Sequence, residues 1–338
     1  MRTGRSLLST LLRPLGRRSR FALLGLVLAL VLAACGTSTP VKPAAEAPPN
    51  VLPKGAVVNP TSAPLSDTSC TASLPPPATM PTPGQMPKGT FMAQIQARGK
   101  LRVGVDQNTY LWGYRNPTGQ MSGFDIDMLR QVAAAIFGPN DPGDIQFVIV
   151  PNADRIQAVQ KGQVDIVAET MTITCARAEK VDFSTVYYQA GQEILVPNGS
   201  TIKGKQDLGG KRVCAPDDST SLTNLRALDL PHMQLWGVNN MTDCLVMLQQ
   251  GQVDAISTDD AILSGLAAQD PNVKVVGPPF SSEPYGMAIS KTHPDFTSFV
   301  NGVLAQVRTD GTWAQLYYND IQSLIGGAAP TPPPPSYR

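Results

Sequence analysis

Threonine and arginine side chains follow a predicted strand in the middle of the chain, where they could hold a small anion. The strand covers residues 165–168, and Thr172, Thr174 and Arg177 come after it. Thr174 is placed to cap a short helix, whose first backbone N–H groups have no partner within the helix. Arg177 carries a planar fork of donors that fits a carboxylate. The segment therefore predicts a carboxylate site; the alternative is an ordinary capped helix with an exposed arginine.

Strands and helices alternate in two rounds along the body of the chain. The first round predicts strands at residues 101–105, 145–150 and 165–168, and helices at 124–137 and 154–160. The second predicts strands at 211–215, 233–236 and 253–256, and helices from 221 and at 242–250. Such alternation is typical of mostly parallel sheets flanked by helices, which bind ligands at the carboxyl ends of their strands. We therefore expect an α/β fold with two lobes.

Two segments are expected to cross between the lobes. Residues 190–196 would lead out of the first lobe and residues 285–290 would return, before terminal helices from residue 293 pack back on that lobe. The predicted boundaries are 90–189 with 286–326 for lobe 1, and 190–285 for lobe 2. Two crossing strands form a hinge about which the lobes can close on a ligand.

The N-terminus has the features of an export signal. The first 20 residues hold six arginines and no acidic residue, and residues 21–32 form an apolar run. The run is shorter than the about 20 residues that cross a bilayer, so it indicates a secretory signal peptide at residues 1–34. The sequence Leu32-Ala-Ala-Cys35-Gly resembles the bacterial motif whose cysteine is diacylated and becomes the new N-terminus. The alternative is an ordinary signal peptide with an incidental Cys35.

The expected mature chain is acidic and anchored by lipid. Removal of residues 1–34 leaves 21 basic against 26 acidic side chains, a formal charge of −5. This balance argues against a nucleic-acid partner and against electrostatic binding to anionic lipid. Two or three acyl chains on Cys35 would hold the protein firmly. We therefore expect it on the outer face of the cell membrane.

Proline-rich segments flank the predicted body. Residues 36–88 contain thirteen prolines among small and polar residues, which indicates an extended tether for residues 35–89. A proline-rich recognition tract is the alternative. The end of the chain, residues 327–338, is also rich in proline, and we expect a disordered tail there.

Four cysteines remain once Cys35 is set aside. An even number in an exported protein suggests two disulfides, with three possible pairings. Cys214 lies in a predicted strand and Cys244 in a predicted helix of the same half, which favours this pair and leaves Cys70 to join Cys175. The chain has two histidines and no Cys-x-x-Cys, so we expect neither a metal site nor a cofactor.

The body as a whole, at about residues 95–322, resembles the family of extracellular solute-binding proteins that bind polar amino acids. The following motifs carry the resemblance: Leu101-Arg-Val-Gly-Val-Asp106, Gly123-Phe-Asp-Ile-Asp-Met128, Thr172-x-Thr-x-x-Arg177, Val181-Asp-Phe-Ser184 and Tyr285-Gly. The resemblance implies the two-lobed type II fold of periplasmic binding proteins. The lipid motif and the tether are similar to those of actinobacterial lipoproteins of the glutamine-binding type.

The resemblance also implies how lobe 1 would hold the backbone of an amino acid. Arg177 would bind the α-carboxylate through two hydrogen bonds, and Thr172 would add hydroxyl and backbone groups. Thr170 stands where the family often has glycine or serine, and its backbone carbonyl would face the α-ammonium.

The resemblance implies that residues of lobe 2 also bind the backbone of the amino acid. Ser219 and Thr220 resemble the loop whose amides close on the same carboxylate, and Asp259 matches the acidic residue that pairs with the α-ammonium. Asp218 replaces the usual glycine of the loop, which puts the geometry and charge of the loop in doubt. The neighbouring Asp260 is expected to cap a helix or to lie at the surface.

Ligand specificity would come from the side-chain end of the pocket. The resemblance places Arg155 toward a second carboxylate, although it could instead be a surface arginine of its helix. Asp106 stands where glutamine-binding relatives have an aspartate, which disfavours a second carboxylate unless Arg155 neutralises it. Tyr110 and Trp112 are expected to wall the pocket, with a place in the core as the alternative.

The resemblance implies a monomeric, non-enzymatic binding protein for aspartate, glutamate, asparagine or glutamine, which hands its ligand to the permease of an ABC importer. One alternative is a sensor whose closed form docks on a membrane receptor. Another is a dehydratase on the same fold, with Glu169 as the general acid. A strand-end glutamate with satisfied hydrogen bonds is the simpler interpretation of Glu169.

Overall fold

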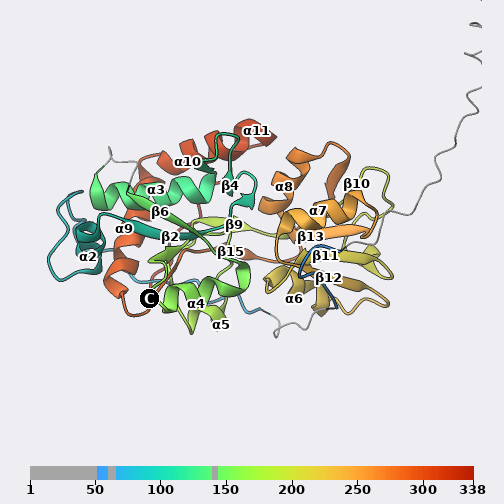
Figure 1. Cartoon of the computed structure of the whole chain (residues 1–338), viewed down its shortest axis with the longest axis horizontal. Coiled ribbons are helices and arrows are strands. Elements are labelled where there is room, and N and C mark those ends of the chain that lie inside the picture. The colour runs from blue at the N-terminus through green and yellow to red at the C-terminus, as the bar shows by residue number, and fades with distance from the viewer. Residues whose placement is uncertain (1–51, 60–65, 139–143) are drawn as a thin grey trace, which may run out of the picture. The chain divides into compact units, whose positions relative to one another are not determined.

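The computed structural model describes residues 52–59, 66–138 and 144–338. Cys35, the predicted signal peptide and the first part of the predicted tether lie outside these residues. The described body contains two sheets with helices on both faces, one sheet in each lobe (Figure 1). The predicted elements agree with those of the structure to within three residues at each end.

The sheet of lobe 1 has five strands in the order β6-β2-β7-β16-β8. Their bounds are Ile145–Ile149, Leu101–Val105, Ile166–Val167, Ala288–Ile289 and Asp182–Phe183. β2 is parallel to β6 and β7, whereas β16 is antiparallel to β7 and β8. A small antiparallel sheet adds β3 (Asn108–Thr109), β4 (Gly113–Arg115) and β5 (Met121–Ser122).

Helices of lobe 1 cover both faces of this sheet. One layer comprises α2 (Phe91–Arg98), α3 (Phe124–Phe137), α9 (Pro294–Thr309) and α10 (Thr312–Tyr317), continued by η3 (Tyr318–Gln322) and α11 (Ser323–Ile325). The other face carries η1 (Asn152–Asp154), α4 (Arg155–Gln160) and α5 (Cys175–Ala178). Successive strand residues point to opposite faces. Ile166 accordingly packs under α3 and α9, while Val167 packs toward α4.

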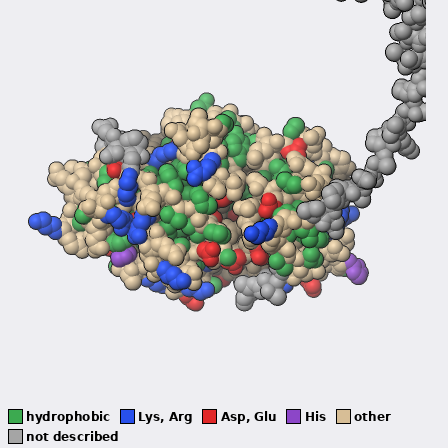
Figure 2. Space-filling view, viewed as in Figure 1, with side chains coloured by type: hydrophobic (Ala, Val, Ile, Leu, Met, Phe, Trp, Pro, Cys, Tyr) green, Lys and Arg blue, Asp and Glu red, His purple; other side chains and the backbone are tan. Residues whose placement is uncertain are grey.

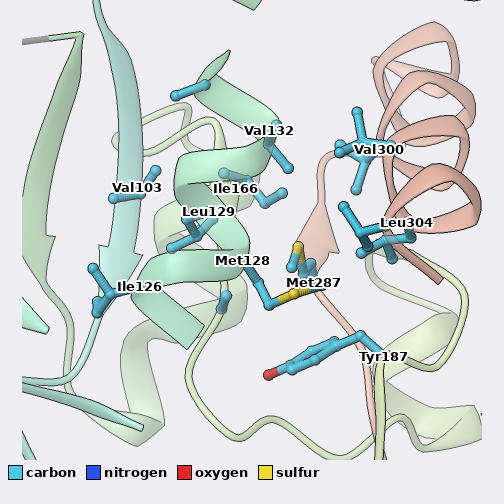
Figure 3. Packing of buried hydrophobic residues seen from close by; sticks show 14 of the residues in the cluster. Val103, Ile126, Met128, Leu129, Val132, Ile166, Tyr187, Met287, Val300 and Leu304 are labelled. Atoms are coloured by element: carbon cyan, nitrogen blue, oxygen red, sulfur yellow. The ribbon is translucent and has the colours of Figure 1, made fainter. Parts of the chain in front are cut away.

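The buried side of α3 shows why this segment is helical. Met128, Leu129, Val132 and Ile136 recur at intervals of three and four residues, which places them on one face of a helix. Figure 3 shows this face packing between the sheet and α9, where it meets Val300 and other core side chains. This packing holds β2 and β7, and hence the segments that follow them, in fixed positions.

The sheet of lobe 2 has six strands in the order β1-β12-β11-β13-β10-β14. Their bounds are Val57–Val58, Gln234–Val238, Arg212–Pro216, Ala255–Asp259, Gln192–Pro197 and Val273–Val276. β11 is parallel to β12 and β13, and the other pairs are antiparallel. Its helical elements are η2 (Lys205–Leu208), α6 (Thr220–Ala227), α7 (Met241–Gln249) and α8 (Asp260–Gln269).

Two antiparallel strands connect the lobes. β9 (Tyr188–Ala190) pairs with β15 (Glu283–Tyr285), and both run between the two sheets (Figure 1). The crossing therefore lies a few residues before each predicted segment, because residues 192–197 already belong to the lobe 2 sheet and residues 288–289 to the lobe 1 sheet. The expectation of two crossing strands is confirmed.

Both predicted disulfides are present. Cys214 joins Cys244 within lobe 2, and Cys70 joins Cys175 across 105 residues of chain. The second bond fixes the segment before the body to the first residue of α5. Thr174, the predicted cap of this helix, accepts a hydrogen bond from the backbone N–H of Arg177 at 3.2 Å.

The proline-rich segments are less independent of the body than predicted. In the expected tether, β1 adds an edge strand to lobe 2, and Ser73 donates a hydrogen bond to the carbonyl oxygen of Phe183 in lobe 1. In the expected disordered tail, Arg338 forms an ion pair with Asp182 and donates its backbone N–H to Ser73. These two predictions are wrong for the described parts, because composition ignores the partners that the folded body supplies.

No helix within residues 52–59, 66–138 and 144–338 is long and apolar enough to cross a membrane.

Candidate functional site

A cavity of about 260 Å³ lies between the two lobes. Its volume is just below the roughly 300–1,000 Å³ of pockets that take drug-sized ligands, so it suits a smaller molecule. The lobe 1 part of its lining follows the ends of β2, β6 and β7, and the lobe 2 part follows β11, β12 and β13. This is the position expected for a site at the carboxyl ends of parallel strands. Figure 2 shows acidic side chains gathered near the middle of the face, between the two lobes.

Arg177 is the cationic group at one end of the cavity. Its Nη1 donates to the carbonyl oxygen of Thr172 at 2.8 Å, and its Nη2 reaches the carbonyl oxygen of Asp218 in lobe 2 at 3.5 Å. Burial lowers the pKa of Arg177 to about 10, so the guanidinium keeps its charge at neutral pH. Carbonyl contacts orient the charge without neutralising it, which leaves Arg177 available to an anion.

The loop before α6 lies opposite Arg177. Ser219 caps this helix, because its Oγ accepts from the backbone N–H of Leu222 at 3.1 Å and donates to the carbonyl oxygen of Pro216 at 2.6 Å. Asp218 has a φ of 50°, in the left-handed region that glycine favours and that aspartate tolerates. The loop thus keeps its turn without glycine. Thr220 and Ser221, the first two residues of α6, line the cavity, and the first backbone N–H groups of a helix have no partner within it.

Glu283 links the two halves of this end of the cavity and was missed by the sequence analysis. It is 1 % exposed, and its Oε2 accepts from the hydroxyls of Thr172 at 2.7 Å and Thr220 at 2.8 Å. Its Oε1 accepts from Asn224 and Ser281. The hydroxyl protons of both threonines are therefore used by Glu283. What Thr172 and Thr220 can still offer a ligand is their backbone groups and hydroxyl lone pairs.

Asp259 is a buried carboxylate on the lobe 2 side. It is 3 % exposed, and its Oδ2 accepts from the hydroxyl of Tyr285 at 2.6 Å. Burial, and then the negative charge of Glu283, raise the pKa of Asp259 well above its usual value. Across the described part of the chain, no ion pair includes Asp259. A cation that entered the cavity would restore its charge.

Asp260 has a different role. Its Oδ1 accepts from the backbone N–H groups of Gly191 and Ala261. It therefore joins the start of α8 to the start of β10 from the first position of the helix, whereas Asp259 holds the N-cap position, and Asp260 does not line the cavity.

The other end of the cavity contains Asp106, Arg155 and Glu169. Arg155 is 4 % exposed, so the alternative of a surface arginine is wrong. Its Nε and Nη1 donate to the carbonyl oxygens of Asn152 and Glu169, each at 3.1 Å. Asp106 accepts from the backbone N–H of Gln107 at 2.7 Å and from the hydroxyl of Thr109. This end can both donate and accept hydrogen bonds.

Thr170 lies between the two ends. Its φ of 41° is unusual for a β-branched residue and indicates local strain. Its backbone N–H donates to Asp125 at 2.7 Å, and Asp125 also accepts from the hydroxyl of Tyr187. Burial raises the pKa of Asp125 to about 7. These bonds hold the backbone of Thr170 in its strained form, at the edge of the cavity.

Tyr110 and Trp112 do not wall the cavity, which corrects the prediction. Trp112 is fully buried among aromatic rings, and its Nε1 donates to the carbonyl oxygen of Ala261 at 2.9 Å. Tyr110 packs edge to face on Tyr114 with ring centres 4.8 Å apart. These rings form contacts within and between the lobes, and the walls are formed instead by smaller side chains such as Met241 and Ile149.

The described part of the chain holds no cluster of three or more histidine, cysteine or acidic side chains suited to a metal ion. The buried acids of the cavity are instead separated by hydroxyls, carbonyls and the two arginines. The site therefore has the donors and acceptors for a small organic ligand with charges of both signs.

Comparison with known proteins shows what this arrangement is similar to. A model of the bacterial extracellular solute-binding proteins, family 3, matches residues 101–319. The ABC transporter glutamine-binding protein GlnH of Bacillus subtilis is 39 % identical over 232 residues, which cover 68 % of this chain and 84 % of that protein. The glutamate-binding protein GluB of Corynebacterium glutamicum is 33 % identical over 241 residues, which cover 68 % and 81 %.

A solved structure is also similar. It is that of the ancestral amino acid-binding protein AncCDT-1, a precursor of cyclohexadienyl dehydratase, with 34 % identity and a TM-score of 0.62. The match covers 68 % of this chain and 99 % of that one.

Proposed function

The chain belongs to family 3 of the bacterial extracellular solute-binding proteins, and we propose that it binds a polar α-amino acid in the cavity between its lobes. The proposed ligands are aspartate, glutamate, asparagine and glutamine. The relatives that are binding proteins for glutamine and for glutamate support this choice, as does the small volume of the cavity.

The observation that carries the proposal is the pairing of Arg177 and Asp259 around one cavity. Arg177 is a cation whose described contacts are carbonyl oxygens, and Asp259 is a buried carboxyl without an ion pair among the described residues. A buried charge is stabilised only when it is paired. A zwitterion satisfies both groups at once, with its α-carboxylate on Arg177 and its α-ammonium on Asp259.

Lobe closure would complete the site. Thr170, Thr172 and Arg177 come from lobe 1, whereas Ser219, Thr220 and Asp259 come from lobe 2. A ligand that contacts both sets stabilises the closed form over the open one. Arg155 and Asp106 would then meet polar atoms of the ligand's side chain, as an N–H donor and a carboxylate acceptor respectively.

We further propose that the protein delivers its ligand to the permease of an ABC importer, in line with the relative from Bacillus subtilis. Uptake of labelled amino acid by cells that lack the gene should fall and be restored by the wild-type gene, but not by one encoding Arg177→Ala. Normal uptake without the gene, together with ligand-dependent capture of a membrane receptor, would support a sensor instead.

The proposed place of action is the outer face of the membrane, with Cys35 as the lipid-bearing residue. The sequence around Cys35 supports this anchor. Cells fed a clickable fatty acid should label the wild-type protein, and Cys35→Ser should abolish the label. An unlabelled wild-type protein would contradict the anchor but not the binding function.

A further inference from the structure

Glu169 is a buried carboxyl group of the cavity that the amino-acid grip does not use. It follows β7, is 6 % exposed and lines the cavity. Its Oε2 is buried and accepts no hydrogen bond from the described residues. The alternative of a satisfied strand-end glutamate is therefore wrong for this oxygen. A buried acceptor without a hydrogen bond destabilises the protein, and a donor on a ligand would recover this loss.

We propose that Glu169 is a specificity-determining residue, which accepts a hydrogen bond from an N–H donor on the ligand's side chain and so selects a carboxamide over a second carboxylate. The inference rests on the proposed function and narrows its four ligands to glutamine and asparagine. Glutamate serves as the matched competitor of glutamine, because the two differ only in the terminal group.

The charges around Glu169 agree with this selection. Two acids, Asp106 and Glu169, and one base, Arg155, line the side-chain end of the cavity. Arg155 makes no ion pair with either acid among the described residues. When Glu169 is ionised, a ligand carboxylate would add a third negative charge here, whereas a carboxamide can place its oxygen toward Arg155 and its N–H groups toward an acid.

The protonation state of Glu169 affects how strongly the site discriminates between glutamine and glutamate. Burial raises the pKa of Glu169 to about 8. The positive charge of Arg155 lowers this pKa, and the negative charges of Asp106 and Asp125 raise it further. Tyr187 also faces this group, and its own pKa is raised well above the usual value. Below about pH 8 the carboxyl group is largely protonated, and a ligand carboxylate could then share its proton. Above this pH the ionised group repels glutamate and attracts an N–H donor.

The preference for glutamine over glutamate should therefore grow as the pH rises. The sign follows because the donor ligand favours the ionised form and the acidic ligand favours the protonated form. Protonation of Asp259 affects the α-ammonium of both ligands alike, so it cancels in the ratio of their affinities. Asp125 also titrates in this range, and a Glu169 variant separates its effect from that of Glu169.

The test is calorimetry of the full-length chain in detergent with glutamine and glutamate at pH 6.5, 7.5 and 8.5. We expect wild-type protein to prefer glutamine by at least about tenfold at pH 8.5. A site whose carboxylate accepts a hydrogen bond from the ligand binds glutamate poorly, because glutamate lacks the side-chain N–H donor. The ratio should fall at least about fivefold on going to pH 6.5. Glu169→Gln should reduce the preference at pH 8.5 by about tenfold and flatten its pH dependence.

Glu179→Gln is the matched control, because Glu179 is exposed and outside the cavity. This variant should keep the wild-type ratio of glutamine affinity to glutamate affinity at each pH. Equal or tighter binding of glutamate by wild-type protein at pH 8.5 would overturn the inference and leave the proposed function standing. A pH-independent wild-type ratio would also overturn it, even where Glu169→Gln failed to fold. Absence of binding by any amino acid would instead overturn the proposed function and this inference with it.

Discussion

The hydroxyl groups of Thr172 and Thr220 lie 3.4 Å apart, although the two residues belong to different lobes. Both donate to the same carboxylate oxygen of Glu283, which lies on the crossing strand β15. One buried acid thus contacts both halves of the cavity and the hinge between them. We infer that these bonds help to hold the lobes in the arrangement that binds the ligand.

Thr220→Val should weaken the binding of every amino acid ligand by about 10- to 100-fold. The change keeps the shape of the side chain but removes a hydrogen bond to a charged group, which is worth about 1.5–3 kcal/mol. Thr223→Val is the matched control on the same helix, because the Thr223 hydroxyl bonds the carbonyl oxygen of Ser219 within lobe 2. Calorimetry that found equal losses for the two variants would contradict a role for Glu283 between the lobes.

Asp259→Asn should abolish amino-acid binding and stabilise the ligand-free protein at neutral pH. The pKa of Asp259 is raised in the folded state, so the unfolded chain releases this proton first and folding loses stability as the pH rises above the usual range of aspartate. Asparagine does not ionise, so it removes this loss of stability, and its side-chain oxygen can still accept a hydrogen bond from the hydroxyl of Tyr285. We expect the melting temperature to rise by at least about 2 °C at pH 7 and the gain to shrink near pH 4.

The neighbouring Asp260 supplies the control for this experiment. Asp260→Asn keeps an oxygen for the backbone N–H groups of Gly191 and Ala261, so it should retain ligand binding. If Asp259→Asn bound the ligand as tightly as wild type, the assignment of Asp259 to the α-ammonium would be wrong.

Arg177→Ala should remove detectable binding of all amino acids while the chain still folds. The variant loses a charge-assisted, two-bond contact with the α-carboxylate. Arg212→Ala is a suitable control, because Arg212 pairs with Asp254 outside the cavity and its loss should affect stability rather than affinity. Circular dichroism would check the fold of both variants. Retained affinity in Arg177→Ala would move the carboxylate site elsewhere.

Loss of the Cys70–Cys175 disulfide should lower stability by about 4–5 kcal/mol, as expected for a closed loop of about 100 residues. It should also weaken ligand binding, since Cys175 begins the short helix that carries Arg177. The Cys214–Cys244 disulfide closes a shorter loop, so replacement of these two cysteines should reduce stability by about 3–4 kcal/mol. Denaturant unfolding and calorimetry on the two double serine variants would compare these effects, and unchanged affinity in the first pair would refute the link to Arg177.

The sequence was informative where local pattern decides the structure. The order of strands and helices follows from apolar periodicity, and the cap at Thr174 follows from residue type and position. The pairing of Cys214 with Cys244 followed from their places in neighbouring elements. Thr172 and Arg177 could be named from the segment that follows a predicted strand, and Asp259 from the family resemblance; the structure brings all three to one cavity.

Other features depend on partners that are distant in the chain. The Oε2 of Glu283 gains its two donors from residues about 60 and 110 positions away, so its own segment does not mark it as part of the site. Residue type alone also could not show whether Trp112 faces a ligand or the core. The ion pair between Arg338 and Asp182 forms only when the chain folds. The composition of residues 327–338 alone predicts a solvated tail instead.

The most direct test of the central claim is calorimetric titration of the full-length chain with polar amino acids and their blocked derivatives. We predict that at least one of glutamine, asparagine, glutamate and aspartate binds. The α-methyl ester of that ligand should lose the contact with Arg177, and its N-acetyl derivative should lose the contact with Asp259. Neither derivative should therefore bind measurably. Binding of a blocked derivative as tightly as the free amino acid would contradict the zwitterion grip, as would the absence of binding by all four ligands.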